Sequence, residues 1–307
     1  MAGNAHLNVA RKRQNDEFYT KTDTVERELK HYGSKLRGKV IYCNCDDYRS
    51  SNFYKYFKHN FSRLGIREVI TSNYSETGES FLTRYDGTRE EVLKLSGTGS
   101  YTGEQDEAVV AALQDAHVII TNPPFSLFKQ FIPFLINNAK DFIILGTINA
   151  VTYVDIFPYI RDGLIYPGIN FNTSEEFYVP DEYEGVVNTS RDGCGRLIST
   201  ISNIAWYTTF RTCSKSLPVG DVKYNPITHP TYDNYDAIEV SRVKEIPSDF
   251  IGVMGVPVNY LSHYSPAEFE IVGSNRGRNQ DPSGYYGRST FLNGRETYKR
   301  VFIKRRR

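Results

Sequence analysis

The run Asn122-Pro123-Pro124-Phe125 contains the residue types that most directly suggest chemistry. It follows the apolar run Val118–Thr121, so it falls where a buried strand gives way to a loop, and open α/β folds bind ligands at such sheet edges. The side-chain oxygen of Asn122 and the carbonyl of a nearby proline could accept both hydrogens of an exocyclic amine, while Phe125 stacks on the ring that bears it. Pro124 would keep the turn rigid. The alternative is an ordinary strand-end turn, for which Asn-Pro and Pro-Pro are common sequences.

A second candidate segment, Cys43-Asn44-Cys45-Asp46-Asp47, ends the short apolar stretch that begins at Lys39. The first strands of a doubly wound sheet place a nucleotide-like ligand at this position. The segment lacks the glycines that admit a pyrophosphate, which argues against NAD or ATP. Two carboxylates would instead attract an adenosine cofactor with a positively charged sulfonium. Equally, Asp46 or Asp47 could simply cap the following helix.

Three further features are weaker. The loop Gly97-Thr98-Gly99-Ser100-Tyr101 could bring backbone close to an adenine ring, although a flexible surface turn is the commoner meaning of such a sequence. Phe18, Tyr19 and Trp206 could wall a ligand pocket or belong to the core. The six histidines show no pairing at metal-ligand spacing, and no Ser/His/Asp arrangement can be assembled from the sequence, so we expect neither a metal centre nor a hydrolase.

These segments need elements to position them, and strands alternate with helices over the first half of the chain. The predicted strands cover residues 39–45, 68–71, 93–95, 118–121 and 142–145, and the predicted helices cover residues 23–31, 51–64, 104–113 and 127–137. This alternation predicts an α/β fold with a doubly wound, largely parallel sheet. After about residue 165 the pattern changes to short β-like runs, of which 198–210 is expected to be the last hairpin of the first sheet. We therefore divide the chain near Cys213, into a domain of residues 15–213 and a smaller, loop-rich, β-containing region of residues 214–307.

Charge is distributed unevenly along the chain. The formal net charge is only +1, but both ends are basic, with Arg11-Lys12-Arg13 near the start. The predicted phosphate-binding residues near the other end are Arg276, Arg278, Arg288, Arg295, Lys299 and Arg300. Local positive charge of this kind is typical of nucleic-acid binding, although a solvated, frayed tail would look the same over the last four residues.

Length and composition exclude several classes of protein. A chain of 307 residues can bury a sizeable core. No apolar run approaches the roughly 18 residues that span a bilayer, so no membrane role is expected. The four cysteines lack metal-ligand spacing, and with no secretory leader they indicate a reducing, cytoplasmic setting.

Several strings taken together resemble one enzyme family, the EcoRI-type adenine-specific DNA methyltransferases. The similar segments are Asp16-Glu17-Phe18-Tyr19-Thr20, Tyr42-Cys43-Asn44-Cys45-Asp46-Asp47, Thr121-Asn122-Pro123-Pro124-Phe125-Ser126-Leu127-Phe128-Lys129, Tyr232-Asp233-Asn234-Tyr235-Asp236-Ala237-Ile238 and Gly252-Val253-Met254-Gly255-Val256-Pro257. The resemblance runs from residue 16 to about residue 272. One departure is Ser100, because an aspartate is expected near this place.

The resemblance implies a Rossmann-like class I methyltransferase core and transfer of a methyl group to the N6 amine of adenine in double-stranded DNA. It implies that S-adenosylmethionine is bound by Phe18-Tyr19-Thr20, Cys43-Asn44-Cys45-Asp46 and Asn122. Asn122, Pro123, Pro124 and Phe125 would be the catalytic residues. The later part of the chain would read the target, and the reacting base would have to leave the stacked duplex.

The tetrad Asn122-Pro123-Pro124-Phe125 is also compatible with other substrates and with another function. An RNA adenine methyltransferase or a protein glutamine methyltransferase would share it, and a decayed methyltransferase could persist as a DNA-binding module. One catalytic event modifies one strand, so a monomer would suffice, and the sequence does not indicate whether a restriction nuclease accompanies the enzyme.

Overall fold

The computed structural model describes residues 18–76, 78–104, 106–185, 188–212, 222–278, 281 and 283–306. Internal contacts divide these residues into two compact units. Unit 1 holds the described residues up to Thr147 together with Gly168–Phe210, and unit 2 holds Ile148–Pro167 together with the described residues from Arg211 onward. The division predicted near Cys213 lies outside the described residues, as do Arg11-Lys12-Arg13, Asp16 and Glu17.

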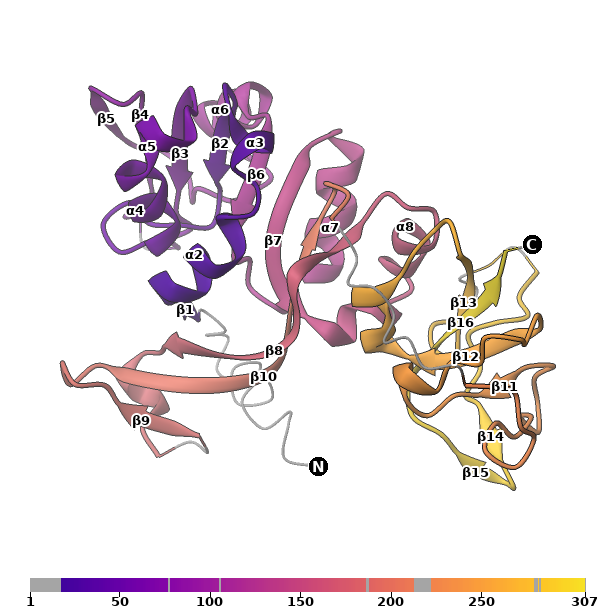
Figure 1. The fold of residues 1–307 in the computed structure, drawn as a ribbon. Coiled ribbons are helices and arrows are strands. Elements are labelled where there is room, and N and C mark those ends of the chain that lie inside the picture. The colour runs from indigo at the N-terminus through magenta and orange to yellow at the C-terminus, as the bar shows by residue number, and fades with distance from the viewer. Residues whose placement is uncertain are drawn as a thin grey trace. The chain divides into compact units, whose positions relative to one another are not determined.

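Unit 1 is built on a ten-stranded mixed sheet with the order β1-β8-β10-β7-β6-β2-β3-β4-β5, in which β9 pairs with β10 (Figure 1). The strands are β1 (Tyr19–Thr20), β2 (Val40–Cys43), β3 (Glu68–Ser72), β4 (Phe81–Tyr85), β5 (Glu90–Lys94), β6 (Val118–Thr121), β7 (Asp141–Thr147), β8 (Tyr166–Tyr178), β9 (Thr189–Arg191) and β10 (Leu197–Thr208). The centre, β3-β2-β6-β7, is parallel, whereas β1 with β8, β10 with β7 and β9, and β4 with β3 and β5 pair antiparallel. The sheet is therefore mixed, and the predicted largely parallel pairing applies to its centre alone. One cause is connection length, since the turn of residues 86–89 between β4 and β5 is too short for a parallel crossover.

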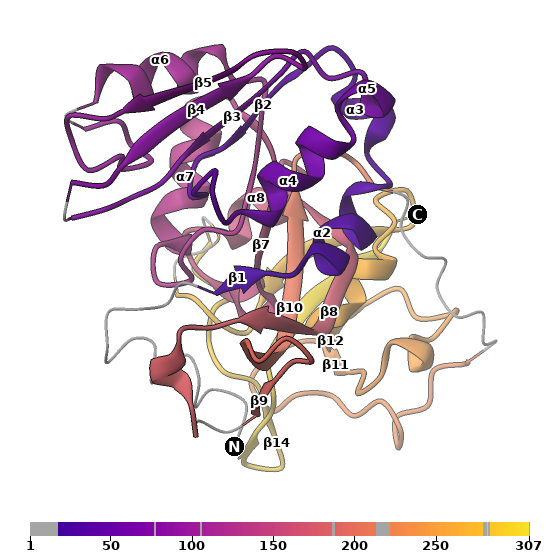
Figure 2. The same ribbon diagram turned by 90° about the vertical axis from the view of Figure 1, so that its left-hand side faces the viewer.

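Helices cover both faces of this sheet. They are α2 (Thr22–Leu29), α3 (Gly33–Leu36), α4 (Asn52–His59), α5 (Phe61–Leu64), α6 (Glu107–Asp115) and α7 (Phe128–Asn137). Neighbouring residues of β10 point to opposite faces: Trp206 contacts Phe53 of α4 with ring centroids 6.0 Å apart, whereas Tyr207 contacts Phe128 of α7 at 5.5 Å. Figure 2 likewise shows α2 and α4 on the opposite side of the sheet from α6 and α7. Trp206 is fully buried and belongs to the core, so it does not wall a pocket.

Local sequence explains where α4 and α5 begin and end. The Ser51 hydroxyl accepts the backbone N–H of Tyr54 at the start of α4, and Phe53 and Phe57 bury the same face one turn apart. The predicted single helix 51–64 divides at Asn60, which ends α4 and precedes α5. Gly65 then ends α5 in the left-handed region with φ of 61°, as helix-terminating glycines do.

The order of the parallel strands creates a switch point. The chain passes from β2 through α4 and α5 to β3 on one side, whereas β6 pairs with β2 on the other side. Connections thus leave β2 and β6 in opposite directions, and a crevice opens at their carboxyl ends. Asn44-Cys45-Asp46 follows β2 and Asn122-Pro123-Pro124 follows β6, so both predicted segments lie at this crevice.

Unit 2 contains a smaller four-stranded sheet with the order β11-β12-β16-β13 and a separate two-stranded hairpin. The strands are β11 (Ile238–Glu239), β12 (Val253–Pro257), β13 (Phe269–Ser274), β14 (Phe291–Leu292), β15 (Arg295–Glu296) and β16 (Arg300–Arg305). The helical segments are α8 (Phe157–Arg161), η1 (Ile148–Thr152), η3 (Val243–Glu245) and η4 (Val258–His263), while η2 (Asp181–Tyr183) belongs to unit 1. A small aromatic cluster that includes Tyr232, Tyr235 and Phe302 forms part of the core of unit 2. None of the described helices is long and apolar enough to span a membrane.

Candidate active site

A pocket of about 670 Å³ lies in unit 1 at the switch point, a volume that suits a nucleoside-sized ligand. Loops that follow β2, β3 and β6 contribute to it, together with β1. The predicted site residues that line it are Phe18, Tyr19, Thr20, Asn44, Cys45, Asp46, Asn122, Pro123 and Pro124. Two predicted residues do not reach the lining. Cys43 is fully buried in the core, and the half-buried ring of Phe125 packs on Phe18 with centroids 5.8 Å apart.

Two asparagines hold the β1 segment over the pocket. The Asn52 side chain donates from Nδ2 to the Thr20 carbonyl at 2.8 Å, and the Asn122 side chain donates from Nδ2 to the Phe18 carbonyl at 2.6 Å. Asn122 lies 104 residues from Phe18, so the tertiary fold brings these groups together. Sequence reasoning missed Asn52, whose only signal was its position at the start of a predicted helix.

The bond to Phe18 determines how the Asn122 amide is oriented. Because Nδ2 is the donor, Oδ1 is the end that remains as an acceptor, and this buried atom has no hydrogen-bond partner among the described residues. The carbonyl of Pro124 is engaged by the backbone N–H of Leu127 at 3.0 Å, which closes the turn after β6. A buried acceptor without a partner is energetically unfavourable, so a ligand that donates a hydrogen bond to it would remove that cost.

Two other pocket-lining side chains also have buried polar atoms without partners in the described part of the chain. They are the hydroxyl of Thr20 and the Nδ2 group of Asn44. Together with Asn122 Oδ1, these atoms offer two possible donors and two possible acceptors to a ligand. The pocket is therefore prepared for a polar ligand that makes several hydrogen bonds.

Asp46 joins the two strand ends that form the crevice. Its carboxylate accepts one hydroxyl from Ser51 and one from Thr121, each at 2.6 Å, and its backbone N–H donates to the Ser72 carbonyl. Burial raises the pKa of Asp46 to about 6, although the two hydroxyls oppose that change. The site thus holds a negative charge at neutral pH that is poorly solvated and would favour a cationic ligand.

Asp47 has a different role at the pocket. Burial would raise its pKa, but hydrogen bonds from the side chain and backbone of Arg49 hold that pKa below its usual value. The helix that follows begins with the Ser51 side chain on the Tyr54 N–H, so neither aspartate supplies the cap that was the alternative interpretation.

The loop Gly97–Tyr101 also reaches the pocket, through Ser100 and Tyr101. Asp106 shapes this loop by accepting the backbone N–H groups of Gly97 and Gly99 at 2.9 and 2.8 Å. Gly99 has φ of +69°, and an added Cβ would lie 2.2 Å from the Asn73 carbonyl oxygen, so only glycine fits. Sequence reasoning missed Asp106 as the residue that orders this loop.

Several lining residues follow β3 and were also missed, among them Asn73, Tyr74, Ser75 and Glu79. The strand over residues 68–71 was expected from the sequence, and its carboxyl end lies at the same edge as those of β2 and β6. Applying the strand-end rule to this third strand would have found them.

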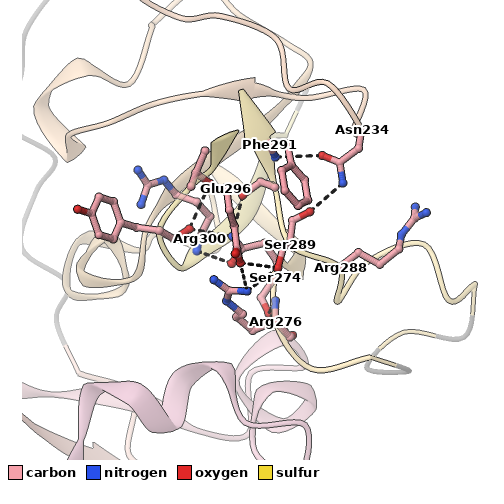
Figure 3. Close-up of polar contacts among 12 residues, drawn as sticks. Asn234, Ser274, Arg276, Arg288, Ser289, Phe291, Glu296 and Arg300 are labelled. Atoms are coloured by element: carbon pink, nitrogen blue, oxygen red, sulfur yellow. Dashed lines mark hydrogen bonds and ion pairs between the residues drawn. The ribbon is translucent and has the colours of Figure 1, made fainter. Parts of the chain in front are cut away.

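The predicted DNA-binding residues of unit 2 differ in how far their side chains are available. Arg278, Arg288 and Arg295 are exposed, whereas Lys299 donates to Asn149 and Arg276 is bound to Glu296 and Ser289 (Figure 3). Arg300 is buried and ion-paired with Glu239. The buried position of Arg300 gives the predicted phosphate contact no support.

Comparison with known proteins identifies the family. The family model of the adenine-specific methyltransferase EcoRI matches residues 6–306. The chain belongs to the EcoRI family of adenine-specific DNA methyltransferases. The resemblance seen in the sequence is thereby confirmed, and membership implies a methyl donor and a DNA substrate.

The relatives align with nearly the whole chain. The type II methyltransferase M.EcoRI of Escherichia coli is 35% identical and covers 100% of this chain and 98% of its own length. M.MpnI of Mycoplasma pneumoniae is 32% identical over 98% of each chain, and M.MgeORF184P of Mycoplasma genitalium is 32% identical over 87% of this chain and 85% of its own. No solved structure matches the chain.

Proposed function

We propose that this enzyme transfers a methyl group from S-adenosylmethionine to the N6 amine of an adenine that has been flipped out of double-stranded DNA at a specific sequence. The observation that carries the proposal is the buried Oδ1 atom of Asn122, which lines the pocket and lacks a partner among the described residues. An acceptor in this position can hold an amine hydrogen, and the family acts on adenine.

The pocket fits the proposed cofactor on chemical grounds. Thr20 and Asn44 offer polar atoms that have no partner within the described chain, and Asp46 offers a poorly solvated negative charge. Phe18, Tyr19 and Cys45 complete the proposed cofactor-binding set around it, whereas Cys43 would act from the core. When bound, the cofactor supplies a methyl group carried on a positively charged sulfonium. The helices on both faces of the sheet and the position of the pocket at the switch point support a class I methyltransferase core.

Positioning of the amine accounts for most of the proposed catalysis. The N6 lone pair is delocalised into the adenine ring, so Asn122 Oδ1 and the Pro123 carbonyl would accept both N–H bonds and favour the geometry in which that pair points at the methyl group. For Phe125 to stack on a base that has left the duplex, its ring would have to leave its contact with Phe18. Pro124 keeps the turn rigid through its carbonyl. The methylated amine is cationic and acidic, and it releases its proton to a nearby acceptor or to water.

The two units suggest a division of labour. Unit 1 would carry the reaction and unit 2 would bind and read the DNA, with the exposed Arg278, Arg288 and Arg295 contributing to that surface. Extruding the base costs a few kcal/mol, which contacts to the DNA would offset. Since one catalytic event modifies one strand, a monomer suffices.

The test is incorporation of label from tritiated S-adenosylmethionine. Purified protein is incubated with unmethylated genomic DNA, and parallel reactions contain RNA or a protein extract. We expect label in DNA alone, as N6-methyladenine within one short motif when the modified positions are sequenced. Label only in RNA or protein would overturn the DNA substrate, and DNA binding without any label would indicate a decayed module.

A further inference from the structure

The β14–β15 hairpin of unit 2 has a sharply defined tip. Its two-residue turn is Asn293-Gly294, and both residues have positive φ, 50° and 73°, as a type I′ turn requires. Phe291 and Leu292 in β14 are half-buried, and Leu292 packs against the aromatic cluster of unit 2. The hairpin is thus anchored at one strand and projects Asn293, Gly294 and Arg295 into solvent.

Asp233 holds this tip from a distance of 60 residues in the sequence. One carboxylate oxygen accepts the backbone N–H of Asn293 at 3.1 Å, and the other accepts that of Gly294 at 2.8 Å. The backbone N–H of Asp233 donates in turn to the Phe291 carbonyl at 2.9 Å. Both central residues of the turn are therefore bound to one carboxylate, which limits how far the tip can move.

The strand leading into the turn is held by a second side chain. Asn234 accepts the Phe291 N–H at 3.2 Å and donates to the Ser289 carbonyl at 2.8 Å (Figure 3). On the returning strand, Glu296 binds Arg276 at 2.6 Å and accepts the Ser289 hydroxyl at 2.6 Å. The hairpin is thus braced on both strands before any DNA is bound.

The tip differs from Arg276 and Arg288 because its side chains have no partner within the described part of unit 2. Within the described part of unit 2, no hydrogen bond or ion pair engages the side chain of Asn293 or of Arg295. By contrast, Arg276 is tied to Glu296, and Arg288 donates to the Tyr285 carbonyl and lies over the Tyr235 ring, 5.5 Å from its centroid. The two unengaged groups are an amide and a guanidinium, the groups that pair bidentately with adenine and guanine edges in the major groove.

We propose that the β14–β15 hairpin is a preformed reader of DNA base edges, in which Asn293 and Arg295 contact the bases and Asp233 is the positioning residue. The inference rests on the proposed function, because a reader has meaning only if DNA is methylated at a specific sequence. A turn that is already held in place loses little conformational freedom when it binds DNA. The free energy of its contacts is therefore available to discriminate between base sequences.

Arg295→Lys separates base reading from a simple phosphate contact. Lysine keeps the charge but loses the planar fork that pairs bidentately with guanine. We expect kcat/KM on the site mapped for the unmodified enzyme to fall about 5- to 150-fold, with affinity for unrelated DNA within about twofold. Equal kcat/KM for the variant and the parent on the mapped site would overturn the assignment of Arg295.

Asn293→Gly tests the second reader without disturbing the turn. Glycine adopts positive φ readily, so the backbone geometry is kept and only the amide is removed. We expect the variant to methylate sites that differ from the mapped motif at one base pair, with the ratio of mapped to altered sites reduced about 5- to 150-fold. An unchanged ratio would remove Asn293 from the proposal.

Asp233→Asn and Asp233→Ala test positioning. Asparagine keeps one acceptor oxygen for the turn, so its discrimination ratio should lie between those of the parent and of Asp233→Ala, while the thermal midpoint and the affinity for unrelated DNA change little. A purely structural role would instead lower the midpoint and scale activity on all sites equally. The matched control is Arg242→Ala, another exposed arginine of unit 2 that pairs with Glu245, and it should leave the ratio unchanged.

The outcomes distinguish this inference from the proposed function on which it rests. If the unmodified enzyme labels no DNA, the proposed function fails and the hairpin has nothing to read. If it labels one motif, and the hairpin variants label that motif with the same ratio and rate, the enzyme assignment is retained and the reader assignment is wrong.

Discussion

Buried polar groups are treated differently in the pocket of unit 1 and at the Glu239–Arg300 ion pair of unit 2. In the pocket, the side chains of Thr20, Asn44 and Asn122 each bury a polar atom for which no partner exists among the described residues. In unit 2, the buried Glu239 carboxylate accepts the Nε–H of Arg300 on both oxygens, at 3.0 and 3.1 Å, and the Nη2–H of Arg300 on one of them. It also accepts the hydroxyls of Tyr232 and Ser241.

The difference separates side chains whose hydrogen bonds a ligand could complete from an ion pair whose bonds are complete within the protein. An unpaired buried group lowers the stability of the free protein, and a ligand that supplies the partner recovers that free energy as binding. A paired buried charge offers nothing to a ligand, but it fixes how strands meet. The β14–β15 hairpin shows the same internal pairing at the surface of unit 2. Asp233 and Asn234 accept the backbone N–H groups of Phe291, Asn293 and Gly294, and the side chains at the tip stay available.

The comparison predicts its largest effect for the buried pair of unit 2. Glu239→Ala leaves the Arg300 charge buried without its partner, so we expect the free energy of unfolding to fall by about 3–5 kcal/mol in urea denaturation. The matched variant Glu296→Ala breaks the exposed pair with Arg276 and should leave the transition midpoint unchanged. A loss below about 1 kcal/mol for Glu239→Ala would show that unit 2 does not depend on the pair.

Asn122→Ala should give the reverse result, a loss of activity without a loss of stability. Removing the amide withdraws the proposed acceptor for the amine, and we expect the rate of methyl transfer to fall roughly 10²–10³-fold. Cofactor affinity, measured by calorimetry, should fall by much less than the rate, because the other residues of the proposed cofactor-binding set remain. The lost bond to Phe18 is partly offset because an unpartnered buried oxygen disappears with it. Methylation at the parent rate would contradict the catalytic role of Asn122.

A smaller effect is expected from the raised pKa of Asp46. With a pKa of about 6, the carboxyl group is mostly ionised at pH 7 and about nine-tenths protonated at pH 5, so affinity for the cationic cofactor should fall up to about tenfold over that range. The folded-state pKa lies above the ordinary carboxyl value, so protonation over this range favours the folded state, and weaker binding would not reflect unfolding. Asp46→Asn should flatten the profile, and an unchanged slope in that variant would exclude Asp46 as its source.

The smallest effect is expected from Arg278→Ala. Arg278 is exposed, and we expect it to contact a phosphate rather than a base. Affinity should therefore fall by a similar factor on all DNA sequences, and the slope of log affinity against log salt should decrease by about 1. A change in sequence preference would place Arg278 among the readers instead and would weaken the contrast with the hairpin tip.

Much of unit 1 could be predicted because its signals are local. The strand over 118–121 and the helix near 127–137 follow from apolar periodicity, and their order indicates which loops lie at the carboxyl ends of the parallel strands. Pairing direction beyond the centre could not be predicted in this way, since the antiparallel partners β8 and β10 are distant in sequence from β1 and β7. The assignment of Ile148–Pro167 to unit 2 could not be predicted either, because it depends on contacts with residues from Arg211 onward in the sequence.

The candidate site was predicted in its residues but not in its geometry. Asn44, Asp46 and Asn122 were identified from residue type and strand-end position, and all three line the pocket. Phe125 was assigned from the tetrad and Cys43 from the resemblance, but neither lines the pocket, because Cys43 is buried in the core and Phe125 packs on Phe18. Asp106 was missed because its bonds to the loop backbone arise only after folding.

The sequence by itself determined the family, the parallel centre of the sheet and the loops that carry the chemistry, because strand periodicity and strand-end motifs are properties of neighbouring residues. The tertiary structure alone decided which atoms are available. Arg300 and Arg295 are the same residue type and lie five positions apart in the sequence. Arg300 is buried against Glu239, whereas Arg295 is exposed on a hairpin held by Asp233. Burial and partner choice depend on groups that are tens of residues apart in sequence, and only the folded chain brings those groups within hydrogen-bonding distance.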